Sequence, residues 1–188
     1  MDAWNDPREK PRIYLKPGEL CVSKRPVVVT TVLGSCVSAT FYHQATGMAA
    51  ICHALQPKCS SREACLDACN TRYRYAVCAI QAMTLQMTSR GIRPREIEVK
   101  LFGGAALIGS RRPEAATISM GRQNVMAAME TINDCGLFLK VMDVGGSFGR
   151  KIIFDTATGE VLMKRLRRND AAGPGAQAQD GGRSRWAL

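Results

Sequence analysis

Cys36 and His53 are the side chains of this chain best suited to nucleophilic chemistry. Cys36 directly follows the tight turn Leu33-Gly34-Ser35, and His53 directly follows the apolar run Met48–Cys52. A thiolate nucleophile requires a base close by, and an imidazole commonly serves as that base. The backbone amides of Gly34 and Ser35 could also hold an oxyanion that forms on an attacked carbonyl.

Three strand-like runs surround this pair and must position it. The run Val27–Val32 is β-branched, Val37–Tyr42 alternates between apolar and polar residues, and Met48–Cys52 is apolar throughout. These compositions are typical of strands. Adjacent strands would bring the cysteine after the first run and the histidine after the third run together.

A structural role is the alternative for both residues. A free cysteine is often a small buried apolar residue, and a histidine at a strand end needs no catalytic role. The chain holds only two histidines, His43 and His53, so few side chains could act as the base. Thr30, six residues before Cys36, could place its hydroxyl near the histidine, although threonine is also simply a good strand former.

The remainder of the chain predicts a layered fold with segregated helices. Helical patterns cover about residues 72–90 and Gln123–Asp134, and strand patterns cover Glu96–Phe102 and Leu137–Asp143. Two further strands flank Thr158-Gly159 as a C-terminal hairpin. We therefore expect an α/β (α+β) layered sandwich, with a mixed β-sheet and two main helices. One domain, residues 13–168, would lie between a disordered N-terminus (1–12) and a disordered basic tail (169–188).

Composition excludes several classes of protein. The 188 residues carry a net charge of +10, but basic residues are not interleaved with aromatic ones, which argues against a nucleic-acid-binding domain. No apolar run approaches the ~20 residues that span a bilayer, and no secretory signal is evident. We expect a cytoplasmic protein that does not span a membrane, with its eight cysteines as free thiols.

Two other groups of residues are candidates for binding sites. Cys59, Cys65 and Cys69 have spacings that do not fit the paired ligands of structural zinc, so we predict no metal. Gly103-Gly104 and Gly145-Gly146 each follow a strand but lack the motifs of phosphate-binding loops. These glycines could instead let the backbone approach an active site.

Taken together and in order, the motifs of this sequence resemble the chemoreceptor glutamine deamidase family (CheD). The similarity covers about residues 14–166 and is carried by these motifs: Leu33-Gly34-Ser35-Cys36-Val37, Gly47-Met48-Ala49 with His53 and Pro57, Phe102-Gly103-Gly104-Ala105, Gly121 with Gln123-Asn124-Val125, Asp143-Val144-Gly145-Gly146 with Arg150, and Thr158-Gly159-Glu160-Val161.

This resemblance implies a cofactor-free amidohydrolase that converts glutamine side chains of methyl-accepting chemotaxis receptors to glutamate. It implies Cys36 as nucleophile, His53 as base and Thr30 as the residue that orients the histidine. It also implies contacts with the cytoplasmic helices of the receptors, and in some lineages with a chemotaxis phosphatase. Oxyanion or substrate contacts would come from the motif residues Gly34, Ser35, Gly103, Gly104, Asn124, Gly145, Gly146 and Arg150. The alternative is a docking regulator of receptor or phosphatase without enzymatic activity.

Overall fold

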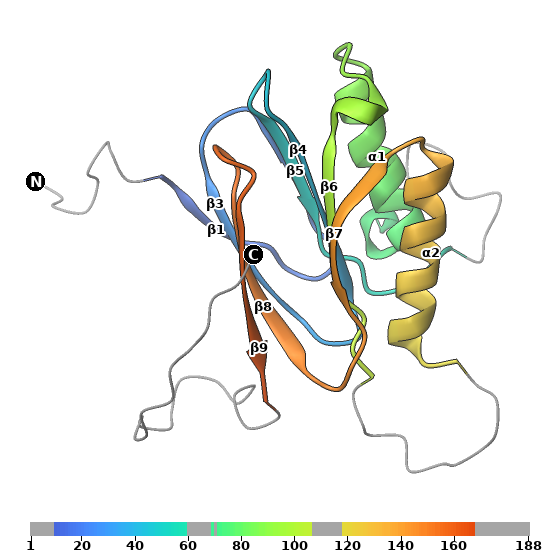
Figure 1. Cartoon of the computed structure of the whole chain (residues 1–188). Helices are drawn as coiled ribbons and strands as arrows, with labels where there is room; N and C mark the ends of the chain where they lie inside the picture. The colour runs from blue at the N-terminus through green and yellow to red at the C-terminus, as the bar shows by residue number, and fades with distance from the viewer. Residues whose placement is uncertain (1–9, 60–68, 70, 107–117, 168–188) are drawn as a thin grey trace, which may run out of the picture.

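The computed structural model describes residues 10–59, 69, 71–106 and 118–167, which form two β-sheets and one layer of helices (Figure 1). The first sheet has the strand order β1-β3-β8-β9 and the second has the order β2-β5-β4-β6-β7. The strands are β1 (Arg12–Tyr14), β2 (Leu20–Ser23), β3 (Val28–Leu33), β4 (Val37–His43), β5 (Met48–Cys52), β6 (Glu98–Gly103), β7 (Phe138–Val144), β8 (Gly149–Asp155) and β9 (Val161–Leu166).

Two cores hold the three layers together. One core lies between the two sheets and includes Val29, Leu33, Ile51 and Phe154. The other lies between the second sheet and helices α1 (Ala76–Thr88) and α2 (Met120–Asp134). The second sheet is therefore covered on both faces, so β4 and β5 are buried along almost their whole length, although β4 includes Ser38, Thr40 and His43.

The α+β class, the two main helices and the C-terminal hairpin are confirmed. The hairpin is the antiparallel pair β8 and β9. The mixed pairing is also confirmed, but the strands divide between two sheets, because β3 pairs with β1 and β8 and does not join β4. Each of the two sheets is itself mixed, since β1–β3 and β6–β7 are parallel pairs and the others are antiparallel. Pairing between β3 and β8 joins residues more than a hundred positions apart, which no local pattern encodes.

Both helices begin at residues other than the predicted ones. The first is split: a 3₁₀ turn over Arg72–Arg74 is followed by extended Tyr75, and α1 begins only at Ala76. The second begins at Met120, three residues earlier than predicted, because the Ser119 hydroxyl caps it by accepting the Arg122 N–H.

Several predictions fall partly outside the described residues. Arg12, placed by the sequence in the disordered N-terminus, is the first residue of β1. Residues 1–9, the whole predicted tail (169–188) and Cys65 are not described. Six cysteines in the described ranges are free thiols: Cys21, Cys36, Cys52, Cys59, Cys69 and Cys135. No helix in those ranges is long and apolar enough to cross a membrane.

Candidate active site

The strand pair β4–β5 places Cys36 and His53 on one face of the second sheet. Beyond the regular ladder, Val37 and Ala54 form a further antiparallel bridge, with N–H···O distances of 2.9 Å in both directions. This register sets Ser38 opposite His53 and makes Cys36 a diagonal neighbour of His53. Directly opposed residues point to the same side of a sheet, so the side chains of Cys36 and His53 both face the first sheet. Diagonal neighbours are close enough for long side chains to meet. The structure thus places the two residues that the sequence singled out on the same face of one sheet, as diagonal neighbours.

Three hydrogen bonds to carbonyl groups hold the cysteine turn, Gly34-Ser35-Cys36, in place. The Gly34 carbonyl accepts the Ala105 N–H at 2.9 Å, and the Cys36 carbonyl accepts the Gly104 N–H at 2.7 Å. The Ser35 carbonyl accepts the side-chain Nδ2 of Asn124 at 2.9 Å. Because all three carbonyls accept hydrogen bonds from the segment after β6 or from α2, the turn is fixed before any substrate arrives.

Glycine is required where this turn meets β6. Gly103 has φ +107°, and a Cβ there would lie 2.2 Å from the Cys36 carbonyl oxygen. Gly104 has φ +67°, and its Cβ would lie 2.3 Å from Val125 Cγ2 on α2. Neither approach is possible for a residue with a side chain. The Gly103-Gly104 pair therefore supports the cysteine turn through its backbone.

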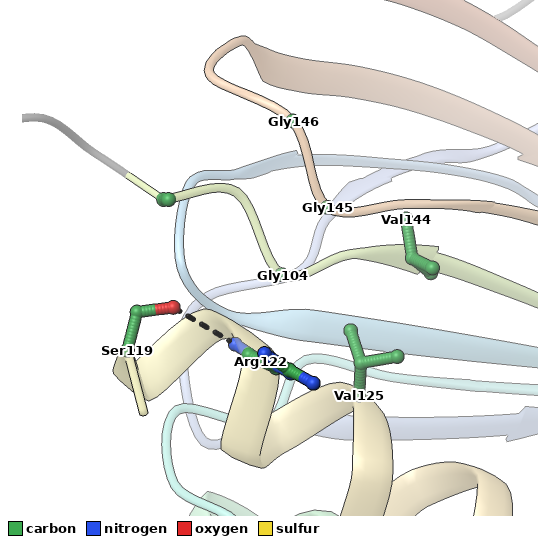
Figure 2. Close-up of a pocket in the computed structure, with 8 residues that line it drawn as sticks. Gly104, Ser119, Arg122, Val125, Val144, Gly145 and Gly146 are labelled. Carbon is green, nitrogen blue, oxygen red and sulfur yellow. Dashed lines mark hydrogen bonds between the residues drawn. The ribbon is translucent and has the colours of Figure 1, made fainter. Parts of the chain in front are cut away.

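The second glycine pair lies beside the first, and Gly104, Gly145 and Gly146 border a cavity (Figure 2). The Gly145 N–H donates to the Gly103 carbonyl, and the Gly146 carbonyl accepts the Ala106 N–H, both at 2.8 Å. The cavity of about 250 Å³ lies between these segments and the first turns of α2, and its lining includes Ser119, Arg122 and Val125. The glycine segments thus expose backbone next to the turn that carries the cysteine.

His53 is buried and its ring is oriented by a threonine. Its Nδ1 lies 2.8 Å from the Thr31 hydroxyl, and that hydroxyl donates its own hydrogen to the Leu15 carbonyl at 2.8 Å. Because the hydroxyl has a single hydrogen, its oxygen can only accept from Nδ1, which therefore carries the ring proton. Nε2 is then left with a lone pair, and it has no hydrogen-bond partner among the described residues.

The residue that contacts His53 is Thr31, and the prediction that Thr30 does so is wrong. Side chains alternate along β3, and Val29, Thr31 and Leu33 point into the core between the sheets. Thr30 lies on the opposite side of the strand. A shift of one residue along a strand reverses the face that a side chain occupies, and the run Val27–Val32 is apolar or β-branched at every position. Its composition therefore gives no sign of which threonine points inward.

Burial keeps both candidate reacting groups neutral. Burial raises the pKa of the Cys36 thiol from its usual 9.0, and a hydrogen bond from the N–H of the same residue offsets this in part. Burial lowers the pKa of His53 from 6.5, while the Leu15 carbonyl and the charge of Glu19 act in the opposite direction. At neutral pH the pair is therefore a thiol and an uncharged imidazole.

Asn124 and Arg150 are both engaged within the protein. Asn124 is fully buried on α2 and also donates to the Leu55 carbonyl at 2.9 Å. Arg150 is buried and pairs with Asp143 at 2.7 Å, which joins the two sheets at the ends of β7 and β8. Burial alone would raise the pKa of Asp143, but the hydrogen bonds from Arg150 and Arg165 lower it overall. The amide nitrogen of Asn124 and the guanidinium of Arg150 therefore already have partners within the protein.

Within the described ranges, no three His, Cys, Asp or Glu side chains gather as a group that could hold a metal ion. Cys59 and Cys69 lie on either side of the segment that contains Cys65, which is itself not described. The prediction that these thiols bind no zinc thus remains a prediction.

Comparison with known proteins identifies related sequences across most of the chain. The family described as CheD chemotactic sensory transduction matches residues 60–165. The "Probable chemoreceptor glutamine deamidase CheD 2" of Geobacter sulfurreducens is 44% identical over 161 residues, which are 86% of this chain and 94% of that protein. A match of this length necessarily extends across Thr31, Cys36 and His53.

Other relatives are similar over comparable lengths. The "Probable chemoreceptor glutamine deamidase CheD" of Oleidesulfovibrio alaskensis is 40% identical, over 90% of this chain and 79% of that protein. Its counterpart in Maridesulfovibrio salexigens is 36% identical, over 84% of this chain and 94% of that protein. Among solved structures, YlmD from Geobacillus stearothermophilus has a TM-score of 0.44 and 14% identity, over 68% of this chain and 50% of that one.

Proposed function

The chain belongs to the CheD family, and from this membership and the site geometry we propose that it hydrolyses glutamine side chains of chemoreceptors to glutamate. The single observation that carries the proposal is the buried hydrogen-bond series from the Leu15 carbonyl through Thr31 to His53. It leaves the lone pair of Nε2 free on the sheet face that also holds Cys36. A general base must present such a lone pair to the nucleophile.

Acylation begins when Nε2 of His53 takes the proton of the Cys36 thiol. The sulfur attacks the side-chain amide carbon of glutamine, and negative charge develops on the amide oxygen. Backbone N–H groups of the cysteine turn stabilise this charge, an effect commonly worth about 3 kcal/mol for one donor. His53 then gives its proton to the leaving nitrogen, so that ammonia departs and a thioester to Cys36 remains.

Deacylation uses the same residues with water as the nucleophile. His53, now uncharged again, takes a proton from water, and the hydroxide attacks the thioester carbon. The sulfur leaves and recovers its proton from His53, which regenerates the starting state and releases glutamate. The whole cycle consumes one water and releases one ammonia, and it needs no cofactor.

The substrate in this proposal follows from the relatives, which are named as probable chemoreceptor glutamine deamidases. We assign the cytoplasmic helices of chemoreceptors as substrate, which places the reaction in the cytoplasm. A chemotaxis phosphatase is a second proposed partner.

Mass spectrometry of receptor cytoplasmic fragments tests the function directly. After incubation with the protein, we expect selected glutamine residues to gain the mass difference between an amide and an acid, with ammonia released in equal amount. Receptor fragments that bind the protein but keep every glutamine unchanged would contradict the proposal and favour the docking regulator.

Thr31 and Thr30 form a matched pair that tests which hydroxyl orients His53. Thr31→Val keeps the side-chain shape but removes the acceptor of the Nδ1 proton, so we expect kcat to fall about 10- to 100-fold, the size of one buried hydrogen bond. Thr30→Val should leave kcat almost unchanged. Thr31→Ser restores the hydroxyl and should restore most of the rate. Equal losses in Thr30→Val and Thr31→Val, measured by ammonia release, would contradict the assignment.

The pH dependence follows from the two shifted groups. The rate falls as acid protonates His53, and since its pKa lies below 6.5, kcat/KM should still exceed half its maximum at pH 6.5. The thiol pKa is raised above 9.0, so kcat/KM should stay near its maximum up to pH values beyond 9. We also expect iodoacetamide to alkylate Cys36 faster as pH rises through 9. Rapid alkylation that is constant down to acid pH would instead indicate a preformed thiolate–imidazolium pair.

A further inference from the structure

One buried side chain of α2 joins the two segments that carry Cys36 and His53. Asn124 has no exposed surface, and its Nδ2 lies 2.9 Å from the Ser35 carbonyl and 2.9 Å from the Leu55 carbonyl. Because a carbonyl oxygen cannot donate, the atom between these two acceptors must be the NH₂ group of the amide. Both of its hydrogens are therefore used, one on each segment.

The bond to Ser35 determines where the N–H of Cys36 points. The Ser35 carbonyl and the Cys36 N–H belong to one peptide unit, and no described peptide bond is cis. In a planar trans peptide the C=O and N–H point in opposite directions. Since the carbonyl is directed at Asn124, the Cys36 N–H is directed away from α2, where it lies within hydrogen-bonding reach of the Cys36 sulfur.

The peptide unit between Gly34 and Ser35 is also held through its carbonyl. The Gly34 carbonyl accepts the Ala105 N–H, so the Ser35 N–H is turned away from the segment that follows β6. Ala105 holds the peptide unit between Gly34 and Ser35 with its backbone N–H, so this bond does not depend on the side chain at position 105. The unit between Ser35 and Cys36 is different, because it depends on the side chain of Asn124.

Packing alone does not explain an asparagine at this position. Its Oδ1 is buried and has no hydrogen-bond partner among the described residues. Burying an unpaired polar atom costs about 1–3 kcal/mol. The two hydrogen bonds that Asn124 donates must compensate for this cost, so its role lies in holding the Ser35 and Leu55 carbonyls.

We propose that Asn124 is a positioning residue that holds the Ser35–Cys36 peptide unit with its N–H directed at the oxyanion. Through Leu55, it also fixes the spacing between the cysteine turn and the segment after His53. This role rests on the proposed deamidation, and it replaces the direct substrate contact that the resemblance implied for Asn124.

Asn124→Asp tests this role with little change of shape. An ionised carboxylate has no hydrogen to donate, so the peptide unit is no longer held. We expect kcat to fall about 100-fold with KM unchanged, as for the loss of one oxyanion donor. Alkylation of Cys36 by iodoacetamide forms no oxyanion, so its rate should fall far less than kcat, and only because the lost N–H bond to the sulfur raises the thiol pKa further.

Thr131→Val is the matched control. Thr131 is buried on the same helix, and its hydroxyl donates to the Ala127 carbonyl within α2. It should lower stability without lowering kcat. If Asn124→Asp does not fold, Asn124→Ser allows the same measurements, because the shorter side chain introduces neither charge nor overlap. Unchanged kcat, or kcat and alkylation falling together, would overturn the role.

Crystal structures of the unmodified protein and the Asn124 variant separate this inference from the proposed function. If the unmodified protein releases no ammonia from receptor fragments, the deamidation proposal fails. The role of Asn124 is then tested by the orientation of the peptide unit between Ser35 and Cys36 in the two structures. A rotated unit in the variant supports it, and a unit with its original orientation overturns it.

Discussion

Cys36→Ala should abolish glutamine deamidation and leave the protein folded. The thiol is the only group in the proposed cycle that forms a covalent bond to the substrate, so its loss should lower kcat by roughly 10⁴-fold or more. The side chain is small and half-buried at the edge of the core between the sheets. We therefore expect the melting temperature to change by only a few degrees. Ammonia release from receptor fragments and thermal unfolding measure the two effects.

Cys21→Ala is the matched control for this substitution. Cys21 is also half-buried at the same core, and burial likewise raises the pKa of its thiol. It lies on β2 opposite Ile51 and has no place in the proposed reaction. Its substitution should leave turnover unchanged. Residual turnover of Cys36→Ala at the level of Cys21→Ala would refute cysteine catalysis.

His53→Ala should have the second-largest effect, with kcat reduced about 10²- to 10⁴-fold, the usual contribution of general acid–base catalysis. Without the imidazole, the proposed cycle has no group that takes the thiol proton or delivers a proton to the leaving ammonia. The substitution also opens space between the sheets, where added imidazole could bind. Partial recovery of turnover in imidazole buffer is therefore expected, and alkylation of Cys36 at neutral pH should become slower still.

His43→Ala provides the comparison, since these are the only two histidines of the chain. His43 lies at the other end of the β4–β5 pair, where its Nδ1 is 2.9 Å from the Thr46 hydroxyl. The loss of that bond should lower stability slightly without changing kcat. If both histidine variants lost activity equally, general-base catalysis by His53 would be wrong.

The sequence by itself determined the features that local chemistry dictates. Cys36 could be singled out because it follows a glycine turn, and His53 because it follows an apolar strand. The sharp turns at Gly103-Gly104 and Gly145-Gly146 were evident because such backbone conformations select glycine. The strand Met48–Cys52 was located with its observed bounds, since its run of apolar residues is interrupted on both sides.

The tertiary structure alone decided which groups meet. Thr31 and not Thr30 contacts His53, because the face of β3 that turns inward depends on packing against the other sheet. The partition into two sheets depends on β3 pairing with β8. Asn124 holds the Ser35 and Leu55 carbonyls from a helix that lies far along the chain from both. Each of these contacts joins segments distant in sequence, so their register is set by the packed core and not by any local pattern.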